Sequence, residues 1–352
     1  MTILADRVEV VIGVDTHKHS HTAAAVSSVG GILGERTVVS DQQGYEQLLQ
    51  FAKEHAGRRA WAIEGTASYG AGLVGFLRQR AEQVLEVDRP HRPARRMGAK
   101  TDALDAVRAA REALAHDHHA EPRVGEQRAA LAVRLAARRS AVDAYTTAQR
   151  QLQDLLVTAP EPVRAKLRAQ SGRRLVAACA RLRLPARADT HTTAVITTLR
   201  ALAQRVQLLA AEAREHERAI LTIVRTWRPD LLALFGIGPI GAAVILCAWS
   251  HPGRLRSEAA FAMVAGVAPI PASSGQTVRH RLNRFGDRQL NRVLHLVVVH
   301  RLRRDPTTRA YAARRAADGK SSAEIRRCLT RYVARQVFRQ LESTPPVVLD
   351  NR

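Results

Sequence analysis

The 352-residue sequence contains little cysteine and no long apolar run. Its three cysteines, Cys179, Cys247 and Cys328, are far apart and odd in number, which argues against a disulfide framework and against a cysteine-based zinc site. A helix that crosses a bilayer needs roughly 20 successive apolar residues, and no segment approaches this length. The N-terminus also lacks the pattern of a signal peptide. We therefore expect a cytoplasmic protein with no membrane partner.

Acidic residues are scarce as well, but only in part of the chain. The 55 Lys and Arg residues exceed the 32 Asp and Glu residues, for a net charge of +23. Residues 1–121 hold 15 basic and 16 acidic residues, a net of −1, whereas the remainder holds 40 and 16, a net of +24. Only five of the basic residues are lysine, and an Arg- and Ala-rich coding bias would raise the charge everywhere, yet the first third stays neutral. The confined positive charge indicates a polyanionic partner such as nucleic acid.

The length allows two or three domains, and three kinds of sequence follow one another. Residues 1–121 alternate expected strands and helices, with a Gly30–Gly31 turn between two strands, which predicts an α/β domain built on a mixed sheet with a hairpin. Residues 122–228 contain long Ala/Leu/Arg helices, which form either a helical hairpin or coiled coil that joins subunits, or a plain bundle. Residues 229–345 predict a third, mainly α-helical domain.

Four acidic residues occupy positions that suit a shared divalent cation. Asp15 ends the apolar, β-branched run that begins at Val8, and Glu64 ends the next apolar strand. Asp102 and Asp105 lie in the first turn of an expected helix, and their i,i+3 spacing places them on one face. Each acid alone could be a helix cap or a turn residue. Together they predict a site for two Mg²⁺ ions, which prefer oxygen ligands and can clamp both oxygens of a phosphodiester during cleavage.

Basic and glycine-containing segments suggest contacts with a phosphate backbone. Four basic residues precede the Asp102 helix and could hold nucleic acid near it: Arg92, Arg95, Arg96 and Lys100. Further along, a turn between two apolar segments resembles a helix-hairpin-helix, in which a helix N-terminus binds phosphate without reading sequence. The glycines of this turn are Gly236, Gly238 and Gly241. A tight turn that binds no DNA is the alternative.

A second candidate centre contains Ser273 and Ser274, followed by Gly275. A hydroxyl that attacks a phosphate needs a flexible backbone to present it and guanidinium groups to bind the phosphate oxygens. Five closely spaced arginines follow: Arg279, Arg281, Arg284, Arg288 and Arg292. Composition alone also fits an ordinary serine–glycine loop.

Two groups of histidines could suggest a zinc site. They are His17, His19 and His21, and His116, His118 and His119. We interpret them as solvated or strand-face residues, because no cysteine accompanies them.

Three strings in one order carry a family likeness: GVDTHK from Gly13, IEGTASYG from Ile63 and KTDALDA from Lys100. With the glycine turn and the Ser-Gly segment, they resemble the DEDD-type insertion-sequence transposases. These are relatives of the Piv-type DNA invertases, and some are bridge-RNA-guided serine recombinases. The resemblance covers roughly residues 8–340. The family often has a second glycine and a lysine after Ser-Gly, where this chain has Gln276-Thr277.

The resemblance implies a ribonuclease H-like (RuvC-like) N-terminal domain whose Mg²⁺ ligands are Asp15, Glu64, Asp102 and Asp105. It also implies a C-terminal transposase domain whose serine attacks DNA and forms a covalent phosphoserine. Ser274 takes this role, with Ser273 as the near alternative. The implied partners are donor and target DNA, a structured guide RNA and further copies of the chain, in a dimer or tetramer that completes the site between subunits.

The leading hypothesis is therefore a DNA transposase that cuts and rejoins DNA. Two other functions fit the same residues. One is a Holliday-junction-resolving nuclease that uses metal ions without a covalent step. The other is a non-catalytic nucleic-acid-binding protein in which the acids are structural.

Overall fold

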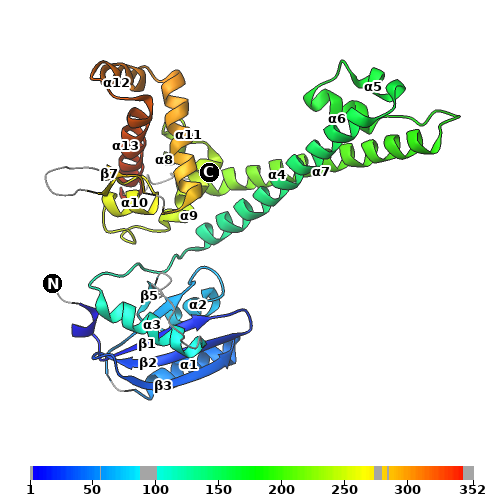
Figure 1. The fold of residues 1–352 in the computed structure, drawn as a ribbon. Helices are drawn as coiled ribbons and strands as arrows, with labels where there is room; N and C mark the ends of the chain where they lie inside the picture. Colours follow the sequence, from blue (N-terminus) through cyan, green and yellow to red (C-terminus); the bar gives the residue numbers. More distant parts are fainter. Residues whose placement is uncertain (1–2, 56, 88–100, 273–279, 284, 344–352) are drawn as a thin grey trace, which may run out of the picture. The chain divides into compact units, whose positions relative to one another are not determined.

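The computed structural model describes residues 3–55, 57–87, 101–272, 280–283 and 285–343. The chain divides into two compact units, residues 1–124 and residues 125–352 (Figure 1). Among the described residues, no helix combines the length and the apolar character that crossing a membrane requires.

The first unit is built on a five-stranded mixed sheet with the order β3-β2-β1-β4-β5. β1, β2 and β3 are antiparallel neighbours, whereas β4 and β5 run parallel to β1. The expected turn at Gly30 joins β2 to β3, and this glycine has a φ of +86°, which favours glycine over residues with a side chain. The strands are β1 (Val10–Thr16), β2 (Ser20–Ser27), β3 (Ile32–Val39), β4 (Arg59–Glu64) and β5 (Val84–Val87).

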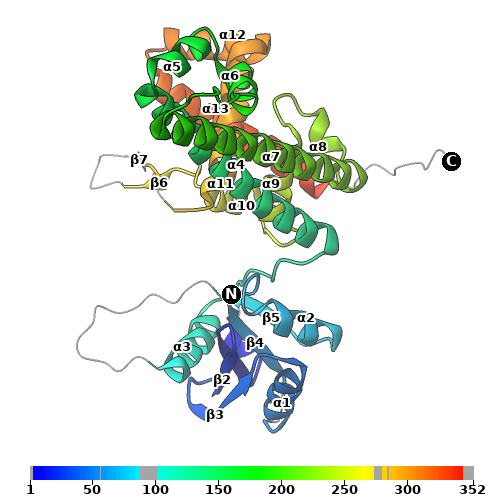
Figure 2. The same cartoon turned by 90° about the vertical axis from the view of Figure 1, so that its right-hand side faces the viewer.

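Helices cover both faces of this sheet, α1 (Gln42–Lys53) and α2 (Ala71–Gln79) on one face and α3 (Asp102–Ala115) on the other (Figure 2). The alternation along β1 explains the layers, because successive side chains of a strand point to opposite faces. Ile12 packs into the core that includes α1 and α2, whereas Val11 packs into the core that includes α3. The first unit is therefore an α/β domain with a mixed sheet, as predicted. A short 3-10 helix, η1 (Leu4–Asp6), precedes β1.

The second unit is helical apart from one short strand pair, within the residues described. Its longest helices, α4 (Glu126–Thr158) and α7 (Thr190–Trp227), pack side by side as a hairpin (Figure 1). The short helices α5 (Glu161–Leu167) and α6 (Gly172–Ala180) join them and share their apolar core at one end of the hairpin.

The remaining helices pack against the other end of the hairpin. Leu131 of α4 and Val224 of α7 belong to the same core as the helices that follow Trp227, so the hairpin and the C-terminal helices form one compact unit. These elements are α8 (Asp230–Ala233), α9 (Pro239–Trp249), α10 (Glu258–Val264), β6 (Ile270–Pro271), β7 (His280–Arg281), α11 (Arg288–Arg304), α12 (Pro306–Ala317) and α13 (Ser322–Glu342).

A buried arginine fixes the end of α7 to the end of α13. The Arg228 side chain is 1% exposed and donates hydrogen bonds to Asp230 and to the backbone oxygens of Gln340 and Leu341. Asp230 also accepts a hydrogen bond from the Gln340 side chain, at 2.9 Å. A buried charge is tolerated only when it is paired and hydrogen-bonded, and this network satisfies both conditions.

Candidate active site

Two strand ends bring the first pair of acids together. β1 and β4 are parallel neighbours, and Val14 pairs with Ile63, so the residues that follow them, Asp15 and Glu64, lie at the same edge of the sheet. The hydroxyl of Thr16 donates a hydrogen bond of 3.0 Å to the backbone oxygen of Glu64 and ties the two strand ends together. The expectation that both carboxylates lie at strand ends is met, and the pairing of β1 with β4 adds that the two strands are neighbours.

The second pair of acids arrives on α3, which crosses β1 at Gly13. A Cβ atom on Gly13 would lie 2.0 Å from the backbone oxygen of Ala106, so the helix and strand backbones approach more closely than any side chain would permit. The Thr101 side chain caps α3 by accepting a hydrogen bond from the amide of Leu104 at 3.2 Å. The first turn of α3 contains Asp102 and Asp105.

The pKa of Asp15 depends on its burial and on the charges of the neighbouring residues. Burial is the main reason that the pKa of Asp15 is raised, and the charges of Asp102, Asp105 and Glu64 raise it further. His17 opposes this effect. Like charges held together in this way disfavour ionisation, and a bound cation would relieve both their repulsion and the cost of burial.

His17 lies between two of these carboxylates. Its Nε2 atom is 3.2 Å from Oδ2 of Asp15 and 3.4 Å from Oδ1 of Asp102. His17 is solvated, as interpreted, with 47% of its side chain exposed, but it also contacts two candidate ligands, which the sequence interpretation did not foresee. The available clue was its position two residues after Asp15, directly after β1 ends at Thr16.

His19, His21, His116 and His118 are strand-face or solvated residues, as expected, whereas His119 is half-buried outside the sheet, where burial lowers its pKa. His21 is buried on β2, where its Nε2 lies 3.1 Å from the Ser40 hydroxyl, and burial lowers its pKa. His116 is exposed and contacts Glu112 at 2.9 Å. Among the described residues, the one cluster of potential metal ligands with mutually close donor atoms contains Asp15, His17 and Asp102, with their donor atoms within 4.8 Å of one another.

The donor set fits a divalent cation. Carboxylate oxygens are the ligands that Mg²⁺ prefers, and an imidazole nitrogen also suits transition metals. Glu64 and Asp105 are not part of this close cluster, and the carboxylate of Asp105 instead pairs with Arg108, whose Nη1 lies 2.7 Å from its Oδ1. Burial is the main cause of the raised pKa of Asp15, and the neighbouring acids add to it, so a cation bound beside Asp15 would stabilise its ionised form.

Several residues singled out in the sequence lie outside the part of the chain that the structure describes. They are Arg92, Arg95, Arg96, Lys100, Ser273, Ser274, Arg279 and Arg284. The strands β6 and β7 flank residues 272–279 in sequence and pair with each other, with Ile270 opposite Arg281.

The three glycines of the predicted hairpin have different environments. Gly236 adopts a φ of +90°, and Gly241 packs against Val293, where a Cβ atom would lie 3.3 Å from its Cγ1. Gly238, the residue before α9, has no other atom within 4 Å of the place where a Cβ would lie. The helix before this turn, α8, is a single turn of four residues. Of the three, Gly238 leaves space for a ligand to approach the backbone.

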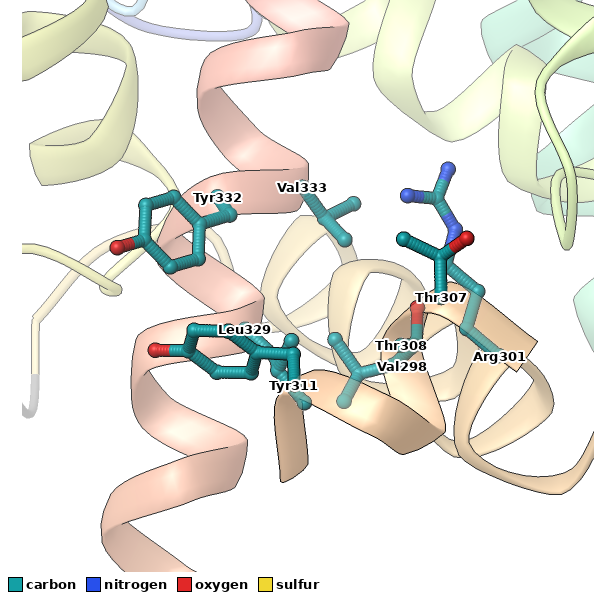
Figure 3. A pocket seen from close by; sticks show the side chains of 8 residues that line it. All are labelled: Val298, Arg301, Thr307, Thr308, Tyr311, Leu329, Tyr332 and Val333. Carbon is teal, nitrogen blue, oxygen red and sulfur yellow. The ribbon is translucent and has the colours of Figure 1, made fainter. Parts of the chain in front are cut away.

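The described arginines that closely follow the serine segment in sequence are exposed. Arg281 lies on β7, and Arg288 and Arg292 are one helical turn apart on α11, as the i,i+4 spacing predicted. A separate surface hollow of about 200 Å³ lies between α11, α12 and α13 (Figure 3). Tyr311 and Tyr332 line it, with ring centroids 5.7 Å apart.

Comparison with known proteins identifies related chains along most of the sequence. A family profile for DEDD transposases of the IS110 type, described as "Transposase", matches residues 12–159. A second profile, "Transposase IS116/IS110/IS902 family", matches residues 229–313. The first match contains the four acids predicted as metal ligands, and the second contains the serine pair.

Two curated relatives come from insertion elements. The "Insertion element IS900 uncharacterized 42 kDa protein" of Mycobacterium paratuberculosis is 26% identical over 375 residues, which cover 91% of this chain and 92% of that protein. The "Insertion element IS110 uncharacterized 43.6 kDa protein" of Streptomyces coelicolor is 32% identical over 114 residues, which cover 32% of this chain and 28% of that protein. With both family profiles matching in order, the chain belongs to the DEDD-type insertion-sequence transposases of the IS110 family and is a DNA transposase.

Proposed function

We propose that this transposase cuts and rejoins DNA with two chemical centres, a metal-binding acidic cluster and a serine nucleophile. The observation that carries the proposal is the convergence of acids from β1, β4 and α3 around Asp15. The proposed ligands of the metal ions, two Mg²⁺ in number, are Asp15, Glu64, Asp102 and Asp105.

Three of the four acids have distinct parts in this proposal. Asp15, whose pKa is raised by the charges of the other three acids, would hold an ion together with Asp102, since their donor atoms lie within 4.8 Å of each other. Asp105 is oriented by Arg108, while the exposed Asp102 meets solvent and the incoming DNA. When bound, divalent ions polarise the scissile phosphate and stabilise the leaving oxygen.

The serine would supply the covalent step. The Ser274 oxygen attacks the phosphorus of the scissile phosphodiester, an Oγ–P bond forms, and the bond from phosphorus to one deoxyribose oxygen breaks. The hydroxyl proton of the serine passes to a base, and the departing sugar oxygen takes up a proton. In the rejoining step a sugar hydroxyl from another strand attacks the phosphoserine and releases the serine unchanged. The number of phosphodiester bonds is conserved, so no external energy source is needed. Ser273 is the alternative nucleophile.

The basic surface would hold the nucleic acid. We assign phosphate contacts to the two groups of basic residues and to the turn before α9. The residues are Arg92, Arg95, Arg96, Lys100, Arg279, Arg281, Arg284, Arg288 and Arg292, with the backbone at Gly236, Gly238 and Gly241. These contacts position DNA but read no bases, and pairing with a structured guide RNA would supply the sequence information instead.

The helical hairpin is the proposed oligomerisation arm. Val133, Val157 and Leu208 each expose about two-thirds of their surface on α4 and α7. Exposed apolar side chains along a long hairpin suit contact with another copy of the chain. We propose a dimer or tetramer, with residues 1–121 as the nuclease domain, 122–228 as the arm and 229–345 as the transposase domain.

Strand transfer from a plasmid that contains the ends of the insertion element tests the proposal. Asp15→Asn with Asp102→Asn should reduce cleavage by about 100-fold or more, since metal ions stabilise such transition states by several kcal/mol. Ser274→Ala, or else Ser273→Ala, should abolish strand transfer and the covalent protein–DNA species seen on a denaturing gel. Full exchange by the double Asp variant would refute the metal role. Normal exchange by both serine variants would refute the covalent step and favour the alternative, a nuclease that uses metal ions alone.

A further inference from the structure

Phe285 is the most exposed aromatic side chain among the described residues, with 80% of its surface in solvent. The chain has only six phenylalanines, and three of them, Phe51, Phe76 and Phe261, are buried in cores. An aromatic ring in water forgoes the free energy that burial would give it. A position this exposed therefore suggests a binding partner for the ring.

The backbone beneath Phe285 is held firmly. Its amide donates a hydrogen bond to the side chain of Asn283 at 2.9 Å. Here the chain after α10 crosses the chain before α11. Gly266 and Gly286, one on each of these two segments, have positive φ, and their backbones pack against each other. A Cβ atom on Gly266 would lie 2.5 Å from the oxygen of Phe285, and one on Gly286 would lie 2.6 Å from the oxygen of Val264.

Two further hydrogen bonds fasten this crossing to the neighbouring helices. The amide of Asp287 donates to the oxygen of Val264 at 2.7 Å, and the Asn291 side chain donates to the oxygen of Ala265 at 2.9 Å. The backbone of Phe285 thus belongs to a hydrogen-bonded connection between the end of α10 and the start of α11. This region lies beside the labels of β7, α10 and α11 in Figures 1 and 2. A fixed support lowers the conformational entropy lost when the ring binds.

The surroundings of Phe285 are cationic. Residues 279–304 contain eight arginines and a single acid, Asp287. The carboxylate of Asp287 is occupied as the cap of α11, where it accepts hydrogen bonds from the amides of Gln289 and Leu290. Exposed arginines flank the ring in sequence on both sides, at Arg281 and Arg288. A protein partner with an ordinary surface would gain little from this charge, whereas a nucleic acid would be attracted by it.

We propose that Phe285 stacks on a nucleobase of the DNA substrate that has left the helical stack, while the neighbouring arginines hold the flanking phosphates. An apolar ring next to cationic side chains is the combination that recognises unstacked bases, because every base presents a π-face. Apolar wedges also insert at distorted steps of a duplex. Leu282, three residues before Phe285, and Met263, whose backbone oxygen accepts a hydrogen bond from Asn283, are also exposed apolar residues. The inference rests on the proposed function only in taking DNA as the partner of this face.

The test compares binding of two short DNA duplexes, one fully paired and one with a single unpaired 2-aminopurine, in EDTA and with the full chain. The wild-type protein should bind the duplex with the unpaired base more tightly. Phe285→Ala should reduce this preference at least about fivefold, Phe285→Trp should retain it, and Phe285→Leu should lose most of it, because stacking requires a ring. The 2-aminopurine emission should change on binding to the wild type and the Trp variant only.

Two matched variants separate stacking from other effects. Arg288→Ala should lower the slope of log binding affinity against log salt concentration by about the value of one phosphate contact. Phe285→Ala should leave this slope unchanged. Tyr332→Ala removes an aromatic that is half-exposed but packs edge-on against Tyr311 beside the hollow in Figure 3, and it should not alter the preference for the unpaired base. Thermal melting checks that each variant is folded.

An unchanged preference in folded Phe285→Ala overturns the inference. The inference is also overturned if Phe285→Ala loses the preference only with an RNA duplex of the same sequence, since the ring would then contact RNA. A changed oligomeric state of Phe285→Ala overturns it as well, since the ring would then contact another subunit. The assay contains no metal ion, so its outcome is independent of the acidic cluster. A double variant, Asp15→Asn with Asp102→Asn, that still exchanges DNA would refute the proposed chemistry and leave the role of Phe285 standing.

Discussion

Substitution of Gly13 by alanine tests how the acidic cluster is assembled. The added Cβ atom would lie 2.0 Å from the oxygen of Ala106 and 2.8 Å from the nitrogen of Ala110. Both are backbone atoms of α3, so no side-chain rotation can relieve the overlap. Contacts of this kind are not found below 3.0 Å, so α3 must retreat from β1 by about 1 Å.

This shift acts on the two acids at the start of α3. Crowding of a packed interface of this kind destabilises a fold by about 1–3 kcal/mol. The catalytic effect should be larger, because a displacement of about 1 Å at a reacting centre can reduce a rate by about 100-fold. We expect Gly13→Ala to fold with a lowered melting temperature, to bind Mn²⁺ or Mg²⁺ more weakly, and to lose most DNA cleavage.

Gly75→Ala is the matched control in the same unit. Gly75 lies on the exposed side of α2, and a Cβ atom there would meet nothing within 4 Å. Since alanine favours a helix more than glycine does, this variant should be as stable as the wild type or more stable by up to about 1 kcal/mol. Wild-type melting, metal affinity and cleavage in Gly13→Ala would show that α3 does not position the acids through this contact.

Two further predictions concern the second unit. Asp230 has a lowered pKa: burial raises it, but hydrogen bonds from Arg228 and Gln340 and the charge of Arg228 outweigh burial. Its contribution to stability is therefore present above about pH 4 and is lost as the pH falls through the lowered folded-state pKa. Asp230→Asn should destabilise the unit by about 3–5 kcal/mol at neutral pH and flatten its acid denaturation curve, and equal pH profiles of the two proteins would contradict this assignment. Gly236→Ala should destabilise by about 1–2 kcal/mol because of its positive φ, whereas Gly238→Ala should melt like the wild type yet bind duplex DNA more weakly. Unaltered DNA affinity in Gly238→Ala would remove this turn from the binding surface.

Much of the first unit follows from local patterns in the sequence. The β-branched runs predict β1 and β4 because such residues suit a pleated, buried strand, and the last residue of each run is the one that reaches the sheet edge. The spacing of Asp102 and Asp105 predicts their common face because helical geometry is local. These features needed no knowledge of the tertiary structure.

The assembly of the site could not be predicted in the same way. That α3 crosses β1 over Gly13 depends on a backbone contact between residues about 90 positions apart, and a lone glycine in a strand has several explanations. The core shared by the hairpin and the C-terminal helices also depends on distant contacts, such as those that bring Leu131 and Val224 together with α9. Periodicity shows which face of a helix is apolar, but not which element covers it.

The placement of His17 gives a last prediction about the metal preference of the site. Its Nε2 atom lies between Asp15 and Asp102, so an ion held by these carboxylates would also meet a nitrogen donor. Imidazole suits transition metals such as Co²⁺, whereas Mg²⁺ prefers oxygen. His17→Ala should therefore weaken Co²⁺ binding by about tenfold or more and leave Mg²⁺ affinity much less affected, as measured by calorimetry and by the visible spectrum of bound Co²⁺. His19→Ala, two residues further along and in none of the described contacts with the acids, is the control. If His17→Ala changed the affinity for both ions equally, the imidazole would act only through its charge and position, and not as a ligand.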